Sequence, residues 1–238
     1  MELVIAAEPD LICLQEVSRS TASTWTRKLT DGGWLHAAIA EPDENRSPGR
    51  RTLSVLTAAR QPLERRDIPH LPWPERVLCT KIGALELVNV HSPISPSPGL
   101  AKVLTHEAVH AFLAAGEGPR VLCGDLNTPR REHPDGRVWT FARTRNGKLR
   151  PERGERWDRA ELALIKDLEA HGFRDAFREI HGLEVREPSW VWQRWGGGYR
   201  LDHLIVSSEV KVQDVRYLHE WRDEGLSDHS ALVASFEN

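Results

Sequence analysis

The sequence has few cysteines and no long apolar run, and each scarcity excludes a class of protein. Its 238 residues include 3 cysteines, an odd number that does not suit the disulfide framework of a small secreted domain. No segment approaches the ~20 consecutive apolar residues that cross a bilayer, and no basic region followed by an apolar stretch marks a secretion signal. We therefore expect a cytoplasmic protein that neither enters a membrane nor depends on disulfides.

A strong net charge is also lacking, but the charge is unevenly distributed. The chain has 32 Lys and Arg against 35 Asp and Glu, a net charge of -3, and 39% of it is hydrophobic. This composition and length are typical of one globular domain, which we expect to span residues 1–238. Residues 130–159, however, contain ten Arg or Lys and five Asp or Glu, a local excess of +5. The near-neutral total therefore hides a basic segment.

Short apolar runs alternate with helical patterns along the chain. Strand-like runs occupy residues 11–14, 53–56, 85–90, 121–123, 201–206 and 231–236. Apolar residues at i, i+3 and i+4 spacing over 100–113 predict a helix that stops at Gly116. A second helix is predicted to start at Asp158, with Glu161 completing a capping box and Gly172 just past its end. This alternation indicates a layered α/β domain.

Polar side chains adjoin five of the predicted strands at their ends. They are Gln15-Glu16, His91-Ser92, the stretch from Gly124 to Asn127, Asp202-His203, and Ser227-Asp228-His229. Strand ends are where open sheets present functional groups. One acidic residue in such a place is more often a cap or an ion-pair partner, so the combination carries the argument. A carboxylate-rich site without thiolates suits a hard cation such as Mg²⁺ or Mn²⁺.

Taken in order, these motifs resemble those of the endonuclease/exonuclease/phosphatase superfamily over nearly the whole chain. The matching stretches are Leu14-Gln15-Glu16, Asn89-Val90-His91, Gly124-Asp125-Leu126-Asn127, Arg200-Leu201-Asp202 and Ser227-Asp228-His229. The resemblance implies a four-layered α/β sandwich with two central mixed β-sheets flanked by helices. It also implies hydrolysis of phosphoester bonds with a divalent cation. The C-terminal half, from Gly172 to Arg178 and from Ser189 to Asp202, is most similar to the exonuclease III and apurinic/apyrimidinic endonuclease branch.

The same resemblance assigns roles to single residues in the catalytic set. Asp125 would orient or deprotonate the attacking water, and Asn127 would hold Asp125 and the phosphate. Asp202 and His229 resemble a carboxylate–imidazole pair in which the acid fixes the tautomer and favours the protonated ring. His91 completes the catalytic set. Exonuclease III relatives usually carry Tyr at this position, whereas deoxyribonuclease-I-like and several phosphatase-like members carry His.

The resemblance also assigns the metal ligands and exposes one departure from the family pattern. Glu16 would be the principal ligand of the Mg²⁺ or Mn²⁺ ion, and Asp228 would lie on the metal side. Family members normally begin with a strand that ends in an Asn of the metal site, but residues 1–7 here read as a helix. We therefore expect the first strand of the fold to be missing. A monomer is expected, although an exposed sheet edge could pair with a second chain.

Two groups of residues are candidates for contact with nucleic acid. In the basic segment, Arg143, Arg145 and Lys148 would border the active site and bind backbone phosphates. The alternative is a solvated surface on which the arginines pair with the acidic residues of 152–158. Three further residues align with the positions that form the apolar pocket for an extruded abasic sugar in repair endonucleases. They are Trp190, Tyr199 and Leu201. For Trp190, core packing is an equal alternative.

The sequence thus predicts a metal-dependent phosphodiesterase acting on nucleic acid. The specific expectation is a DNA nuclease of the exonuclease III or abasic-site type, with a role in DNA repair. One alternative is a phosphatase or phosphodiesterase acting on a small molecule, a lipid headgroup or a protein–DNA adduct, which His91 supports. A second is a catalytically weak binding module of the same fold, because fold alone does not settle function.

Overall fold

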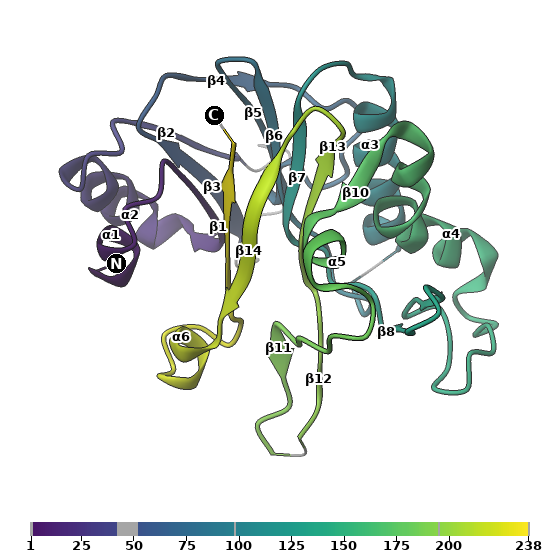
Figure 1. The fold of residues 1–238 in the computed structure, drawn as a ribbon. Helices are drawn as coiled ribbons and strands as arrows, with labels where there is room; N and C mark the ends of the chain where they lie inside the picture. Colours follow the sequence, from purple (N-terminus) through teal and green to yellow (C-terminus); the bar gives the residue numbers. More distant parts are fainter. Residues whose placement is uncertain (1, 42–51, 98, 195, 238) are drawn as a thin grey trace.

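The protein is a layered arrangement of strands between helices, seen in a computed structural model that describes residues 2–41, 52–97, 99–194 and 196–237. In chain order the elements are α1 (Glu2–Ala6), β1 (Leu11–Ser18), α2 (Arg19–Asp31), β2 (His36–Ile39), β3 (Leu53–Ala59), β4 (Leu63–Arg66), η1 (Pro74–Arg76), β5 (Val77–Ile82), β6 (Leu85–His91), α3 (Ala101–Ala115), β7 (Arg120–Asp125), β8 (Arg131–Glu132), β9 (Val138–Trp139), α4 (Gly154–Ile165), η2 (Asp167–His171), β10 (Phe173–Asp175), α5 (Ala176–His181), β11 (Trp190–Val191), β12 (Gly198–Tyr199), β13 (Asp202–Ser207), β14 (Val212–Leu218), α6 (His219–Asp223) and β15 (Ala231–Phe236). Helices α1 and α2 lie on one side of the strands, and α3 and α4 on the other (Figure 1).

The central layer is a six-stranded mixed sheet with the strand order β10-β13-β7-β6-β5-β4. Strands β6 and β7 are parallel, and α3 forms the crossover that a parallel pair requires. The remaining neighbours are antiparallel. Val88 and Leu122 of this sheet pack against Val109 and Leu113 of α3 in one buried cluster. Burial of these aliphatic side chains holds the sheet against its helices.

The second layer of strands packs against the other face of the six-stranded sheet and is divided into two ladders. One has the order β1-β3-β2 and the other pairs β14 with β15, all antiparallel. Leu11 of β1 and Leu232 of β15 both contact the cluster that contains Val121 and Leu204 of the central sheet. With helices outside each strand layer (Figure 1), the predicted four-layered α/β sandwich is confirmed.

The helix predicted over residues 1–7 is present as α1. Within the described part of the chain, α1 precedes β1 and no strand comes before β1. Strand β1 pairs with β3 alone, and β15 pairs with β14 alone. Each of these two strands therefore has one edge without a strand partner among the described residues. Dimer formation through such an edge stays a prediction.

The first predicted helix is confirmed, but the start predicted for the second helix is wrong. Helix α4 begins at Gly154, four residues before Asp158, and Gly172 follows the 3₁₀ turn η2 in a left-handed conformation with φ 76°. Asp158 and Glu161 lie inside the helix, 6% and 1% exposed. Their three-residue spacing matches a capping box, but it equally places two side chains on one helix face. Here that face is buried, and its contacts with Thr140 and Lys102 outweigh the cap.

Candidate active site

Three polar residues line up at one end of the six-stranded sheet. His91 ends β6, Asp125 ends β7 and Asp202 begins β13. His91 is the register partner of Asp125, and Asp125 is the register partner of Asp202. Register partners on neighbouring strands point to the same face of a sheet. The side chains therefore converge, as their positions at the strand ends predict.

Asn127 holds the carboxyl group of Asp125 from two directions. The backbone N–H of Asn127 donates to Oδ1 of Asp125 at 2.8 Å, and its side-chain Nδ2 donates to Oδ2 at 2.8 Å. Burial and, to a smaller extent, the neighbouring Asp202 raise the pKa of Asp125 to about 7, against the opposing effects of His229 and the Asn127 hydrogen bond. A carboxyl group fixed in place with a pKa near neutrality is suited to proton transfer.

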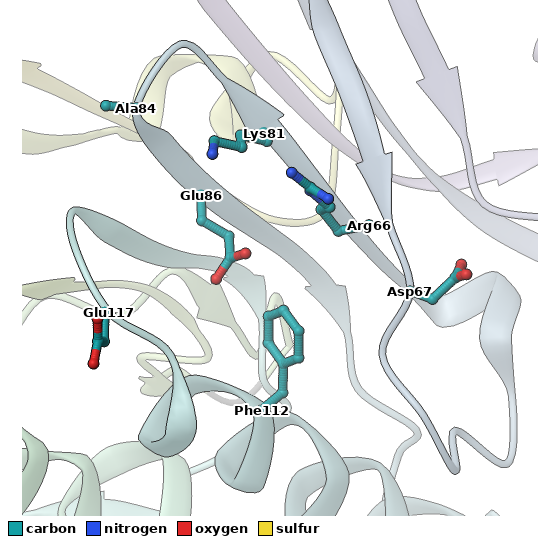
Figure 2. A pocket seen from close by; sticks show the side chains of 7 residues that line it. All are labelled: Arg66, Asp67, Lys81, Ala84, Glu86, Phe112 and Glu117. Atoms are coloured by element: carbon teal, nitrogen blue, oxygen red, sulfur yellow. The ribbon is translucent and has the colours of Figure 1, made fainter.

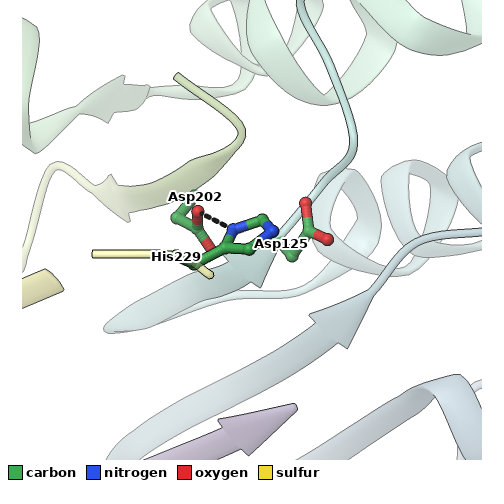
Figure 3. A group of neighbouring side chains, drawn as sticks. All are labelled: Asp125, Asp202 and His229. Carbon is green, nitrogen blue, oxygen red and sulfur yellow. Dashed lines mark hydrogen bonds and ion pairs between the residues drawn. The ribbon is translucent and has the colours of Figure 1, made fainter. Parts of the chain in front are cut away.

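Asp202 and His229 form the predicted carboxylate–imidazole pair, with Nδ1 of His229 2.7 Å from Oδ2 of Asp202. Burial disfavours the charged ring, but the charge and hydrogen bond of Asp202 outweigh burial and raise the pKa of His229 to about 9. Burial opposes ionisation of Asp202 too, yet His229 brings the pKa of Asp202 below its usual value. The ring lies between the two carboxyl groups (Figure 3). A charged imidazole directed into the site suits contact with a phosphoryl group.

His91 is a neutral imidazole at the centre of the site. Burial and, to a smaller extent, the nearby guanidinium of Arg76 lower its pKa to about 3. Nη1 of Arg76 lies 2.5 Å from Nδ1 and 3.1 Å from Nε2, so the nearer contact makes Nδ1 the acceptor and leaves the proton on Nε2. Nε2 lies 3.5 Å from Glu16 Oε1 and 3.7 Å from Asp125 Oδ2. His91 therefore links the Glu16 side of the site to Asp125.

Glu16 owes its orientation to an irregular backbone. The pairing of β1 with β3 shifts register between Leu14 and Val17, and Glu16 has a left-handed φ of 58°. Bulges of this kind re-aim a side chain, often beside an active site. Behind it, Gln15 donates to the side chain of buried Asn89 at 2.7 Å. This amide pair joins β1 to β6 and fixes Glu16 relative to His91.

The donor atoms at this end of the sheet fit a hard divalent cation. Asp125 and Asp202 offer carboxylate oxygens that lie within 4.8 Å of one another and of a ring nitrogen of His229, but the protonated ring of His229 is a charged neighbour rather than a ligand. Glu16 adds a carboxylate, 63% exposed, that reaches the same nitrogen of His91 as Asp125 does. Carboxylate oxygens without thiolates are the donors that Mg²⁺ and Mn²⁺ prefer. Asp228, the other predicted ligand, is exposed and outside this cluster.

The aromatic residues predicted to contact substrate lie beside the catalytic set. Trp190 and Tyr199 are partners on the hairpin β11–β12, and their rings stack with centroids 6.1 Å apart. A β-bridge connects Trp190 to His229. Trp192, which sequence reasoning treated as structural, adds a ring that is 45% exposed and edge-on to Trp190. Leu201 is only 6% exposed, so little of its side chain is open to a ligand.

The basic segment divides between ion pairs and open cations. Arg143 pairs with buried Asp158 at 2.5 Å, as the alternative interpretation of the segment expects. Arg145 and Lys148 are exposed and form no ion pair within the described part of the chain. These two side chains therefore remain the candidates of this segment for contact with phosphates.

A separate hollow of 340 Å³ lies away from these residues. It is lined by Arg66, Asp67, Lys81, Ala84, Glu86, Phe112 and Glu117 (Figure 2). Glu86 stands near the start of β6 and His91 at its end, five residues apart. At ~3.3 Å per residue, this places the hollow about 16 Å along the strand from the catalytic set. The hollow is no part of the site.

The comparison with known families decides the affiliation of the chain. The model of the endonuclease/exonuclease/phosphatase family matches residues 1–229. The chain belongs to this family. Phosphodiester hydrolysis, the activity predicted from the sequence, is the activity that this membership supports. None of the curated proteins compared with the chain matches it.

Two solved structures are similar in fold to this member of the endonuclease/exonuclease/phosphatase family. A structure of an AP endonuclease from Archaeoglobus fulgidus has a TM-score of 0.73 at 22% identity and covers 100% of this chain and 92% of its own. A 3' phosphatase from Neisseria, bound to a product DNA hairpin, has a TM-score of 0.71 at 22% identity, over 100% and 93%. At this identity the likeness establishes the fold. Every described helix is too short or too polar to cross a membrane.

Proposed function

We propose that this protein is a Mg²⁺- or Mn²⁺-dependent phosphodiesterase acting on DNA, of the abasic-site endonuclease or exonuclease III type. One observation carries the proposal. The imidazolium of His229, held by Asp202, lies next to Asp125, a buried carboxyl whose pKa is about 7. A cation, a positioned base and a clamp for phosphoryl oxygens are what hydrolysis of a phosphodiester needs.

The residues of this chain divide the reaction between them. Asp125, held by Asn127, accepts a proton from the attacking water, and the new bond forms between the water oxygen and phosphorus. His229 carries its charge on Nε2 toward the phosphoryl group and relieves the negative charge that develops there. The bond from phosphorus to the leaving oxygen breaks, and that oxygen takes up a proton from solvent water, while Asp125 later returns its own proton to solvent. A bound divalent cation would add Lewis acidity at the phosphate.

The surroundings of the site favour a nucleic acid over a small phosphoester. The stacked rings of Trp190 and Tyr199 lie one β-bridge from His229, and aromatic faces of this kind stack on bases. Further along the chain, in the basic segment of residues 130–159, Arg145 and Lys148 supply exposed positive charge, which suits contact with backbone phosphates without reading sequence. The structural similarity to an AP endonuclease and to a phosphatase bound to a DNA hairpin supports the same substrate class.

A substrate panel tests this proposal. Purified protein with Mg²⁺, with Mn²⁺ or with chelator is offered an abasic-site duplex, an intact duplex, a duplex with a 3' phosphate and a generic phosphomonoester. Metal-dependent cleavage of a DNA substrate, lost in Asp125→Asn, is the expected result. Turnover of only the phosphomonoester would overturn DNA as the substrate, and a complete absence of chelator-sensitive turnover would favour the binding module.

His91 favours a second candidate within the same chemistry, a phosphatase acting on a protein–DNA adduct or a small molecule. A neutral imidazole with its Nε2 toward Glu16 and Asp125 replaces the Tyr usual in exonuclease III relatives. A tyrosyl-phosphate oligonucleotide added to the panel discriminates the two. Faster metal-dependent release of tyrosine than cleavage at the abasic site would establish this second activity.

A further inference from the structure

A fully buried ion pair lies behind the active site and has no part in the reaction described above. Nζ of Lys102 on α3 is 2.8 Å from Oε1 of Glu161 on α4, and the two side chains are 0% and 1% exposed. Withdrawing two charges from water is costly, and apolar residues of similar size often serve equally well between helices. The other hydrogen bonds of the two side chains, to Asn127 and Thr128, indicate a specific role for the pair.

Lys102 reaches the residue that holds Asp125. Its ammonium donates a second hydrogen bond, at 2.7 Å, to the backbone carbonyl of Asn127. Asn127 has a left-handed φ of 50°, a conformation that residues other than glycine adopt infrequently. In this conformation both its N–H and its Nδ2 point to Asp125. Lys102 thus binds the backbone carbonyl of Asn127, while the N–H and the side-chain amide of Asn127 orient the carboxyl group of Asp125.

Glu161, the partner of Lys102, binds Thr128, the residue that follows Asn127 in the chain. Its Oε2 accepts hydrogen bonds from Thr128 Oγ1 at 2.9 Å and from the backbone N–H of Phe141 at 2.7 Å. Its Oε1 accepts a bond from Trp157 Nε1 at 2.8 Å, besides the bond from Lys102. Four donors satisfy the carboxylate, as a stable buried charge requires. Residues 127 and 128 are therefore both bonded to one rigid, buried pair.

We propose that Lys102 and Glu161 are positioning residues of the active site, which hold Asn127 in its left-handed conformation and thereby aim the carboxyl of Asp125. This proposal rests on the proposed function, because Asp125 is the base in that reaction. The competing interpretation is that the pair only joins α3 to α4. If the pair positions Asn127, loss of the Lys102 ammonium lowers kcat and loosens residues 126–128, whereas if it only joins the helices, the loss lowers thermal stability alone.

The test compares Lys102→Met with Val103→Ala on the same helix. Val103 is 1% exposed and packs against Trp157 and Ala160 of α4, so its truncation weakens the contact between the helices without touching Asn127. For Lys102→Met we expect kcat on the best DNA substrate to fall by about 10- to 100-fold with KM within about twofold, because a small misplacement of a catalytic group has this effect. Val103→Ala should lower the melting temperature and leave kcat within about twofold.

Hydrogen exchange supplies a readout that needs no substrate. Deuterium uptake by a peptide containing residues 126–128 should be at least about tenfold faster in Lys102→Met than in Val103→Ala, since local opening governs exchange. If Lys102→Met does not fold, the double variant Lys102→Met/Glu161→Gln removes both charges together and should give the same two results. Equal exchange in this segment, or an unchanged kcat, would overturn the positioning role. Failure of the wild-type protein to cleave any DNA would instead overturn the proposed function and leave the exchange result to decide this one.

Discussion

Nδ1 of His229 donates a hydrogen bond to Oδ2 of Asp202 across 2.7 Å, although 27 residues separate the two in the chain. Asp202 begins β13 in the central sheet, and His229 lies in the loop before β15 in the second layer. The contact therefore joins the two strand layers at the candidate active site. It also determines the charge of the ring, because a carboxylate beside an imidazole favours its protonated form.

Replacing Asp202 with Asn should weaken catalysis more at high pH than at low pH. With Asp202 the pKa of His229 is about 9, and without that charge it should fall toward the ordinary 6.5. We expect kcat/KM to fall by about 10²–10⁴-fold at pH 8 and by less at pH 6, where the ring is still protonated. The measurement is a pH–rate profile, whose alkaline limb should move to lower pH. Asp214→Asn on β14, whose side chain is 48% exposed, is the control, and an unmoved limb in Asp202→Asn would contradict the assignment.

Asp125 should make the metal-free protein less stable as the pH rises. Its pKa is about 7 in the folded protein against an ordinary 3.8, so the native state binds more protons than the unfolded state between these values. The free energy of unfolding then falls as the pH rises through this window. Asp125→Asn should lose this part of the pH dependence and should be the more stable protein at pH 8 in chelator. Urea unfolding at pH 4, 6 and 8 measures the effect, and parallel curves for the two proteins would contradict it.

A divalent cation should stabilise the fold as well as support turnover. At a concentration of about 100 times Kd, a ligand that binds only the native state adds about 2.7 kcal/mol, which raises the melting temperature of a chain of this size by roughly 5–10 °C. Mg²⁺ or Mn²⁺ should produce this shift in the wild-type protein. Glu16→Gln should reduce it, whereas Glu64→Gln on remote β4 should not. A shift of equal size in both variants would remove Glu16 from the metal site.

Arg145 and Lys148 should contribute to the salt dependence of DNA binding. Each phosphate contact that is lost lowers the slope of log K against log[salt] by about 0.9, so the double change to Ser should reduce the slope by about 2. The matched control exchanges Arg65 and Arg66, which are exposed on β4 and paired with acidic residues. Fluorescence anisotropy between 50 and 300 mM salt gives the slopes. A slope equal to that of the wild-type protein would place the two cations away from the DNA.

A layered α/β domain and the polar end of its sheet were predictable from local pattern, whereas the four-layered sandwich followed from the resemblance to the family. Apolar runs of strand length end at His91 and Asp125, another begins beside Asp202, and these ends meet at one edge of the sheet. The start of α4 was not predictable in the same way. An acidic pair spaced by three residues, Asp158 and Glu161, signals a helix cap and a buried helix face equally well. Only the packing partners distinguish the two.

The sequence by itself determined the order of the strands' polar ends, the family to which the chain belongs and the types of side chain at the site. The tertiary structure alone decided how those side chains are charged and held. Burial and the charge of Arg76 keep His91 neutral by lowering its pKa, and Lys102 donates a hydrogen bond to the carbonyl of Asn127, 25 residues along the chain. No local pattern encodes these contacts, because a pKa depends on burial and on neighbouring charges. Both come into being only when distant segments pack together.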